Sequence, residues 1–231
     1  MSLVLVTMSG RPGDDLGHEV RERHLRSPRE AGLSPICVAG SASPHEVAEV
    51  LDVCKAAYLP GTDYVPSSLG ESEEASRRGA AAAELPWDAW KVSADLLVLE
   101  GAWHRHLPVL GICGGMQAMA ISAGGHLRAA GADVLHRHRS VEGGEVVTLS
   151  AGSLACSVLG EVTEINSFHR QVIARAPPGL RATGVATDGV VEALEAPLEA
   201  HPFWLGLQWH PELLRDDRPF EALADAAARR A

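Results

Sequence analysis

The stretch VLGICGGMQAM, residues 109–119, decides the fold because its character changes in the middle. Val109 to Ile112 form a short apolar run typical of a buried strand, and residues 114–123 have the pattern of a helix. Cys113 stands at the junction, with a glycine pair after it. The carboxyl end of a parallel strand that leads into a helix is the ligand-binding edge of an open α/β sheet. We therefore expect Cys113 on a tight, exposed turn at such an edge.

The rest of the chain favours an α/β fold in which strands and helices alternate. In the first half, strands are expected at 3–7, 34–40, 57–60 and 109–112, and helices at about 15–31, 43–54, 87–101 and 114–123. This alternation predicts a mostly parallel sheet with helices on both faces. The second half holds strands at 145–150, 161–168, 180–187, 189–196 and 203–209, with helices at 154–159 and 219–230. It predicts an antiparallel extension within one domain spanning 1–231.

Composition excludes several classes of partner. The formal net charge is -10, which argues against nucleic acid and anionic membrane, since binding either needs clustered Lys and Arg. No apolar run reaches the roughly 18 residues of a membrane span, and the N-terminus lacks the basic start of a signal peptide. The four cysteines are scattered, which favours free thiols in a reducing cytoplasm. His136 and His138 lack a further ligand at metal spacing, so we expect neither a metal nor a cofactor.

The thiol at the turn has two interpretations. Cys113 could be an inert, small core residue, since free cysteine is often buried. Alternatively it is a nucleophile on an elbow, where Gly111, Gly114 and Gly115 give the turn room. In that case the helix N-terminus favours the thiolate, and its free N–H groups can hold an oxyanion.

A cysteine nucleophile needs a base, and the segment LGLQWHPE, residues 205–212, offers one. An apolar strand ends there at His210, Pro211 interrupts the strand, and Glu212 follows. An imidazole at a strand end with a carboxylate two residues later is the arrangement of base and orienting group in a triad. Taken alone, the segment is better interpreted as a polar strand end.

Together, PVLGICGGMQ and LGLQWHPE resemble the class I glutamine amidotransferase superfamily. The stretch INSFHRQVIARAPPGLRATGVATDGVVEALE, residues 165–195, is similar to its γ-glutamyl hydrolase and γ-glutamyl-γ-aminobutyrate hydrolase branch, peptidase family C26. YLPGTDYVPSSLGE, residues 58–71, resembles that branch's glycine turn, and REAGLSPICV its second helix–strand junction. The resemblance runs from about Leu3 to Leu214 and implies a three-layer α/β/α, flavodoxin-like sandwich.

The resemblance also implies roles for individual residues. It makes Cys113 the nucleophile, His210 the general base and acid, and Glu212 the residue that orients His210. The implied oxyanion hole consists of the N–H groups of Gly61 and Gly114. The implied substrate-binding residues are Gln117, Ser167, Phe168 and His169.

Two departures from the family pattern lie in the two segments that are implied to form the oxyanion hole. Pro60 and Thr62 flank Gly61 where the family usually has two glycines, and Gly114 replaces a larger residue, often Arg, after the nucleophile. Residues 72–83 have no counterpart in the family and could form a solvated loop or a lid. Without the resemblance, Gln117 would be interpreted as a surface amide and His169 as a core histidine. The other three cysteines, Cys37, Cys54 and Cys156, are expected to be packing residues.

The implied activity is hydrolysis of γ-glutamyl amides through a thioester, with a small γ-glutamyl compound as substrate and no nucleic acid or membrane partner. One alternative is a glutaminase subunit that delivers ammonia to a separate synthase. Another is a non-catalytic binding relative, against which the intact set of Cys113, His210 and Glu212 argues. The sequence leaves the leaving amine and the oligomeric state open, a homo-oligomer included.

Overall fold

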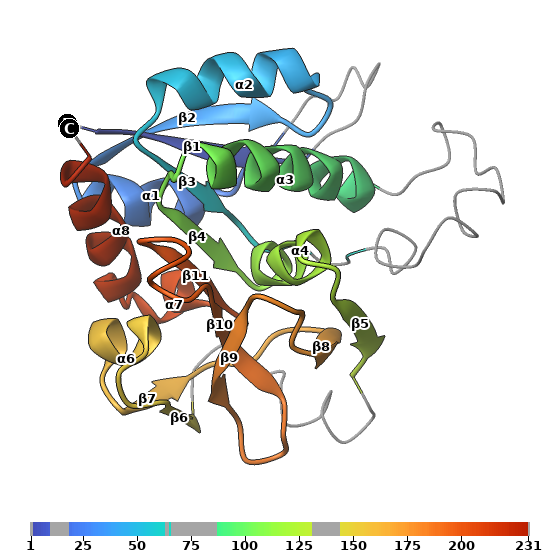
Figure 1. Cartoon of the computed structure of the whole chain (residues 1–231), viewed down its shortest axis with the longest axis vertical. Helices are drawn as coiled ribbons and strands as arrows, with labels where there is room; N and C mark the ends of the chain where they lie inside the picture. Colours follow the sequence, from blue (N-terminus) through green and yellow to red (C-terminus); the bar gives the residue numbers. More distant parts are fainter. Residues whose placement is uncertain (1, 10–18, 63–64, 66–86, 131–143, 231) are drawn as a thin grey trace, which may run out of the picture.

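Strands and helices alternate along the chain in the computed structural model, which describes residues 2–9, 19–62, 65, 87–130 and 144–230 (Figure 1). The strands of the large sheet are β1 (Ser2–Met8), β2 (Leu33–Ala39), β3 (Ala56–Leu59), β4 (Val109–Ile112), β6 (Glu145–Leu149), β7 (Val162–Ile165), β9 (Arg181–Val185), β10 (Val191–Glu195) and β11 (Trp204–Leu207). The helices are α1 (Glu22–Glu30), α2 (Pro44–Val53), α3 (Trp87–His104), α4 (Gly114–Ser122), α6 (Leu154–Leu159), α7 (Pro211–Leu214) and α8 (Arg218–Ala228).

The strands form one mixed sheet in the order β2-β1-β3-β4-β11-β10-β9-β6-β7. Neighbours from β2 to β11 are parallel. Neighbours from β11 to β7 are antiparallel. Counted along the chain, the parallel strands have the order 2-1-3-4-5 of flavodoxin-like folds, which bind ligands at the carboxyl ends of their strands. The predicted parallel sheet with an antiparallel extension is confirmed.

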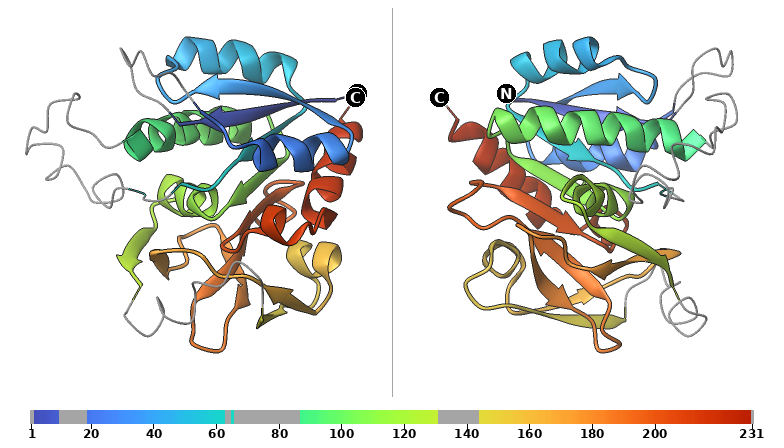
Figure 2. Two further views of the ribbon diagram at one scale, coloured as in Figure 1. Left: turned by 180° about the vertical axis from the view of Figure 1, so that it is seen from behind. Right: turned by 45° about the vertical axis from the view of Figure 1, so that its right-hand side comes forward.

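Helices cover both faces of the parallel part and complete three layers. Helices α2, α3 and α4 bury one core, which includes Leu5 and Met116. Helices α1 and α8 cover the other face, where Tyr58 and Phe220 pack edge to face. Figure 2, left, shows α1 and α8 in front of the sheet with α3 behind it. Side chains of β1 alternate between these cores because successive strand residues point to opposite faces.

Local sequence signals explain where several elements begin. Helix α2 starts at a capping box in which the Glu46 amide donates to Ser43 Oγ at 3.3 Å and the Ser43 amide donates to Glu46 Oε2 at 2.7 Å. The predicted start of the first helix at about residue 15 is wrong, since α1 begins at Glu22. Glu19 instead exchanges two backbone hydrogen bonds of 2.9 Å with Ser9, which holds this segment extended.

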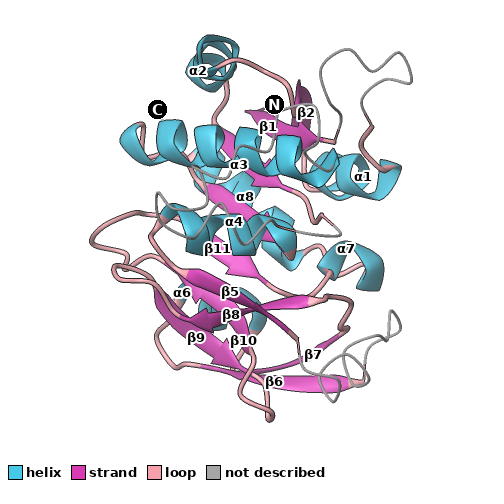
Figure 3. Ribbon diagram, turned by 90° about the vertical axis from the view of Figure 1, so that its right-hand side faces the viewer, coloured by secondary structure: helices cyan, strands magenta, loops and turns pink. Residues whose placement is uncertain are grey.

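A second, small sheet was not predicted. Strands β5 (His126–Ala129) and β8 (Gln171–Arg175) pair antiparallel next to α4 (Figure 3). The two strands are short and distant in sequence, so neither has enough period-two pattern to be recognised alone.

No helix in the described part of the chain is both long and apolar enough to cross a membrane.

Candidate active site

The turn between β4 and α4 holds Cys113 in a strained backbone conformation. Its φ of 51° and ψ of -106° are unusual for a residue with a side chain, and such strain concentrates at functional sites. The Cys113 amide donates to Leu207 O at 2.7 Å on β11, which fixes the turn. A Cβ atom at Gly115 would collide with Leu59 O of β3, so the helix can approach the sheet only with glycine there. The sulfur therefore stands on the expected elbow, but the expectation that the turn is exposed is wrong, since Cys113 is buried.

His210 is fixed in the chain just past the end of β11. Its amide donates to Asn166 Oδ1 at 2.8 Å, and its carbonyl accepts from Asn166 Nδ2 at 3.0 Å. The side chain uses Nδ1 in a 2.7 Å hydrogen bond with Glu212 Oε1, and both residues are buried. Because a carboxylate accepts there, Nδ1 carries a proton and Nε2 is left for chemistry.

The structure brings Cys113, His210 and Glu212 together. Burial lowers the pKa of His210, but the charges of Glu212 and of the Cys113 thiolate, with hydrogen bonds to both groups, raise it to about 10. Burial raises the pKa of Glu212, but the charge and hydrogen bond of His210 outweigh burial and leave it below its ordinary value. This geometry keeps the imidazole of His210 protonated near neutral pH and in hydrogen-bond contact with the side chain of Cys113.

Two glycine-containing turns meet at the sulfur. A Cβ atom at Gly61, just after β3, would lie 3.0 Å from His210 Cε1 and 3.3 Å from Cys113 Cβ. A Cβ atom at Gly114 would lie 2.5 Å from Thr62 Oγ1 and 2.7 Å from the Thr62 amide nitrogen. The backbone of residues 61–62 thus packs directly against the start of α4. The two predicted oxyanion donors lie on these touching segments.

Three glutamines form a buried network beside the sulfur, Gln171 joining it through its main-chain carbonyl. Gln117 Nε2 donates to Gln171 O at 2.8 Å and to Gln208 Oε1 at 3.1 Å, so Gln117 is a buried residue and not a surface amide. Gln208 Nε2 in turn lies 3.5 Å from Cys113 Sγ. Gln171 exchanges two 2.8 Å hydrogen bonds with the backbone of Val65. Gln208 and Gln171 were not singled out from the sequence, although both lie inside its quoted motifs.

The segment after β7 contributes three predicted residues in different ways. Phe168 is 47% exposed, and its ring centre lies 6.5 Å from that of His210. His169 Nε2 lies 3.1 Å from Ser167 Oγ and 3.6 Å from Glu192 Oε1. Phe168 and His169 line the cavity, whereas Ser167 is buried and holds His169.

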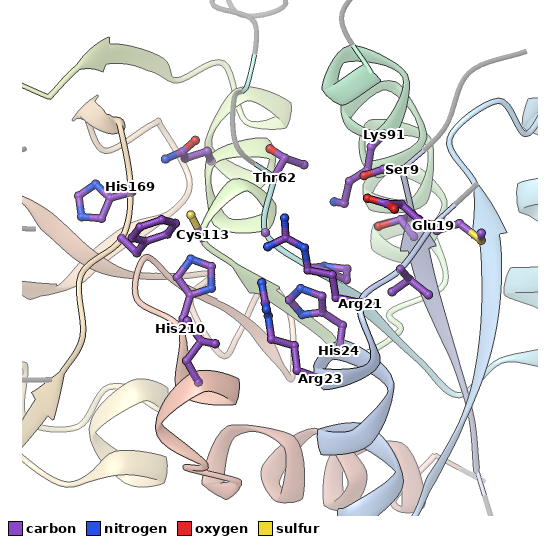
Figure 4. A pocket seen from close by; sticks show the side chains of 18 of the residues that line it. Ser9, Glu19, Arg21, Arg23, His24, Thr62, Lys91, Cys113, His169 and His210 are labelled. Atoms are coloured by element: carbon purple, nitrogen blue, oxygen red, sulfur yellow. The ribbon is translucent and has the colours of Figure 1, made fainter. Parts of the chain in front are cut away.

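A cavity of about 810 Å³ opens in front of the sulfur at the carboxyl ends of β1, β3 and β4. Figure 4 shows Cys113, His169 and His210 on one side and Lys91, Ser9 and Glu19 on the other, with Arg21 between them. Lys91 is buried and donates to Asp95 Oδ2 at 2.7 Å. The side of the cavity away from the sulfur therefore holds one basic group, Lys91, which is paired with Asp95, and one acidic group, Glu19.

Helix α1 supplies two site residues that the sequence did not reveal. His24 Nδ1 lies 3.8 Å from Glu212 Oε1, and Arg23 Nε lies 3.9 Å from the same oxygen. A charged surface helix gives no signal of such a contact, because its partner lies almost at the other end of the chain.

The remaining cysteine and histidine predictions have mixed outcomes. Cys54 is buried and Cys156 half-buried, but Cys37 on the edge strand β2 is exposed, so its assignment as a packing residue is wrong.

Among the described residues, no three His, Cys, Asp or Glu are grouped to bind a metal ion. His136, His138 and the proposed lid at 72–83 lie outside the described residues.

Comparison with known proteins places this site in a family. The family model named peptidase C26 matches residues 12–212. A Mycobacterium tuberculosis protein named as a glutamine amidotransferase is 33% identical over 204 residues, which cover 85% of this chain and 63% of the relative. The gamma-glutamyl-gamma-aminobutyrate hydrolase of Escherichia coli is 29% identical over 209 residues, covering 84% of this chain and 78% of the enzyme. The chain thus spans less than two thirds of the mycobacterial relative.

Solved structures share the fold at low sequence identity. A Thermoplasma acidophilum protein described as a GMP synthase subunit has a TM-score of 0.66 at 17% identity, over 99% of this chain and 95% of that chain. The glutaminase domain of the Trypanosoma brucei CTPS has a TM-score of 0.70 at 16% identity, over 100% of this chain and 95% of that chain. The family model, which extends over most of the sequence, decides the assignment: the chain belongs to the peptidase C26 family.

Proposed function

We propose that the protein hydrolyses γ-glutamyl amides by nucleophilic catalysis with Cys113, His210 and Glu212. The observation that carries this proposal is the contact of one buried imidazole with both a carboxylate and a thiol at a strained strand–helix turn. That arrangement provides a nucleophile, a base and an orienting group. A relative named as a gamma-glutamyl-gamma-aminobutyrate hydrolase supports the choice of bond.

The first half of the reaction forms a thioester. The Cys113 thiolate attacks the γ-carbonyl carbon, and a carbon–sulfur bond forms. The negative charge that develops on oxygen is held by the amides of Gly61 and Gly114, which lie on the two touching turns. The carbon–nitrogen bond then breaks as His210 Nε2 gives its proton to the leaving amine.

The second half releases glutamate. Water attacks the thioester carbonyl, and His210 Nε2 takes its proton. The carbon–sulfur bond breaks and the thiolate returns to its imidazolium partner. Glu212 keeps the proton on Nδ1 throughout, so that Nε2 alternates between acid and base. Gln117, Phe168 and His169 line the cavity, and in this proposal they bind the glutamyl group.

The cavity favours a hydrolase over a glutaminase. Its volume of about 810 Å³ exceeds what a free glutamine needs, and its lining includes Glu19 and Lys91, which is paired with Asp95, as well as two further cations, Arg21 and Arg23. A leaving amine that carries a carboxylate would fill this space and meet these groups. The expected substrate is therefore a γ-glutamyl derivative of an acidic amine.

Glutamate release from three compounds tests this proposal. We expect the highest kcat/KM for γ-glutamyl-γ-aminobutyrate, a lower value for γ-glutamylethylamine, and the lowest for free glutamine. Arg21→Gln should reduce the difference between the first two, because it removes a cation from the cavity wall. Cys113→Ala should be inactive on all three, with Cys54→Ala as the matched change of another buried thiol.

The other outcomes identify the alternatives. Preference for free glutamine would make the protein a glutaminase, and the need for a synthase could then be tested. No glutamate release by the wild type from any compound would favour the non-catalytic alternative.

A further inference from the structure

The carboxylate of Glu212 has few direct partners for a buried charge. Its Oε1 accepts the 2.7 Å hydrogen bond from His210, whereas Oε2 has no hydrogen-bond partner among the described residues. A buried carboxylate with one hydrogen bond from another residue can rotate away from that partner unless further charges or dipoles, which here include the amide of Glu212 itself, hold it. The neighbouring groups therefore decide whether Glu212 stays aimed at the imidazole.

These neighbours come from α1. Arg26 Nη2 donates to the Glu212 carbonyl at 3.1 Å and fixes its backbone. Arg23 Nε and His24 Nδ1 lie 3.9 Å and 3.8 Å from Glu212 Oε1. Residues near the start of one helix thus hold both the main chain and the carboxylate of Glu212.

His24 acts on Glu212 as a neutral dipole. Burial lowers its pKa to about 3, although the Glu212 charge opposes this, while the positive charges of Arg23, His210 and Lys91 add to the lowering. His24 Nδ1 also lies 3.0 Å from the Tyr58 hydroxyl, whose pKa is raised by burial and by Glu212. The nearby carboxylate favours the tautomer with the proton on Nδ1, whose N–H donates to the Tyr58 hydroxyl oxygen and brings its positive end near Glu212 Oε1, 3.8 Å from Nδ1.

We infer that His24 is a positioning residue. It keeps the Glu212 carboxylate aimed at His210 and so maintains the hydrogen-bonded pair formed by the His210 imidazole and the Cys113 side chain. The inference rests on the proposed function for its role in turnover. Arg23 assists from the cavity side, where it lines the wall. Both Arg23 and His24 act on the Cys113 sulfur indirectly, through Glu212.

Three variants of this site test the inference. His24→Phe removes the N–H and leaves the Tyr58 hydroxyl without its partner, so the double variant His24→Phe, Tyr58→Phe removes both ends of that hydrogen bond. His24→Asn places an amide N–H near the position of Nδ1 and should restore function. His201→Phe is the matched control, since His201 is equally buried but lies at the other end of β11.

Two readouts separate this inference from the proposed activity. The first is kcat and KM on γ-glutamyl-γ-aminobutyrate, where the double variant should lose about tenfold in kcat with little change in KM. The second is the rate at which iodoacetamide alkylates Cys113, followed by peptide mass spectrometry, which needs no turnover. In the double variant this rate should fall at pH 7, and its pH profile should move to higher pH.

The outcomes of these experiments distinguish a positioning role of His24 from a general structural role and from failure of the proposed activity. Wild-type kcat and alkylation in the double variant would overturn the role of His24. Equal losses in His201→Phe, or a failure of His24→Asn to restore either readout in a folded protein, would assign a general structural role instead. If the wild type hydrolyses no γ-glutamyl compound but the alkylation pattern holds, the positioning stands and the proposed function fails.

Discussion

Strand β11 has a buried histidine near each of its ends, and near neutral pH one of them is uncharged and the other is protonated. His201, before the strand, packs against the rings of Trp103 and Trp204, and burial with the nearby charge of His106 lowers its pKa to about 4. His210, after the strand, is also buried, yet its pKa rises to about 10. Burial acts in the same direction on both. A carboxylate and a thiolate within hydrogen-bond reach make the difference, and only one end of the strand supplies them.

The largest expected effect on kcat comes from replacing one of the two histidines at a time by asparagine. His210→Asn should lower kcat by at least about 10³-fold, because it removes both the proton carrier and the partner of the thiolate. His201→Asn should leave kcat within error and lower only the melting temperature. Steady-state kinetics and thermal unfolding of both variants measure this contrast, which disappears if His201→Asn is as inactive as His210→Asn.

A smaller effect is expected from adding one methyl group at the turn. Gly114→Ala places its Cβ 2.5 Å from Thr62 Oγ1 and 2.7 Å from a backbone nitrogen, so the oxyanion segment must move and kcat should fall about 10²-fold. Gly101→Ala is the control far from the site. Its Cβ would lie 2.5 Å from Leu51 Cδ1, the end of a flexible side chain, so stability should change and kcat should not. Full activity of Gly114→Ala would contradict the oxyanion assignment.

The pH dependence of activity tests the charged state of His210. Because its pKa is raised to about 10, the imidazolium persists through neutral pH and is lost only as pH rises through about 10. We expect kcat/KM to stay nearly level from pH 7 to 9 and to fall above that. A decline centred near pH 6.5, the ordinary histidine pKa, would show that Glu212 and Cys113 do not hold the proton.

The smallest effect concerns stability in acid. The pKa of His201 is about 4 in the folded protein and about 6.5 when unfolded. As pH falls from about 6.5 to 4, the unfolded chain therefore binds a proton that the folded chain does not, and stability decreases. His201→Phe should lose less unfolding free energy than the wild type between pH 7 and 5 in urea titrations. Identical losses would place the acid sensitivity elsewhere, for example at His24.

The sequence predicted those parts of the fold and site that local patterns encode. The elbow at Cys113 follows from an apolar run, a thiol and two glycines, and the structure has a strand end and a helix start there. His210 and Glu212 lie two residues apart, so their hydrogen bond is also a local event. The family resemblance supplied their approach to Cys113, which no local pattern contains.

What the sequence did not predict depends on contacts between distant segments. His24 and Arg23 look like ordinary residues of a charged helix until α1 is packed beside Glu212. The pairing of β5 with β8 and the bridge between Ser9 and Glu19 are likewise tertiary events that override local helix or loop preferences. Their energetic origin lies in partners that no sequence window includes.

The central claim is that the thiol beside His210 forms a covalent bond with the glutamyl group, and acid-quenched mass spectrometry during turnover tests it directly. Mixed with excess γ-glutamyl-γ-aminobutyrate and stopped within the first turnovers, the enzyme should carry a glutamyl adduct on the peptide that contains Cys113. The peptides of Cys37, Cys54 and Cys156 should remain unmodified. Undiminished glutamate release by Cys113→Ala, or an adduct on another cysteine alone, would contradict the account.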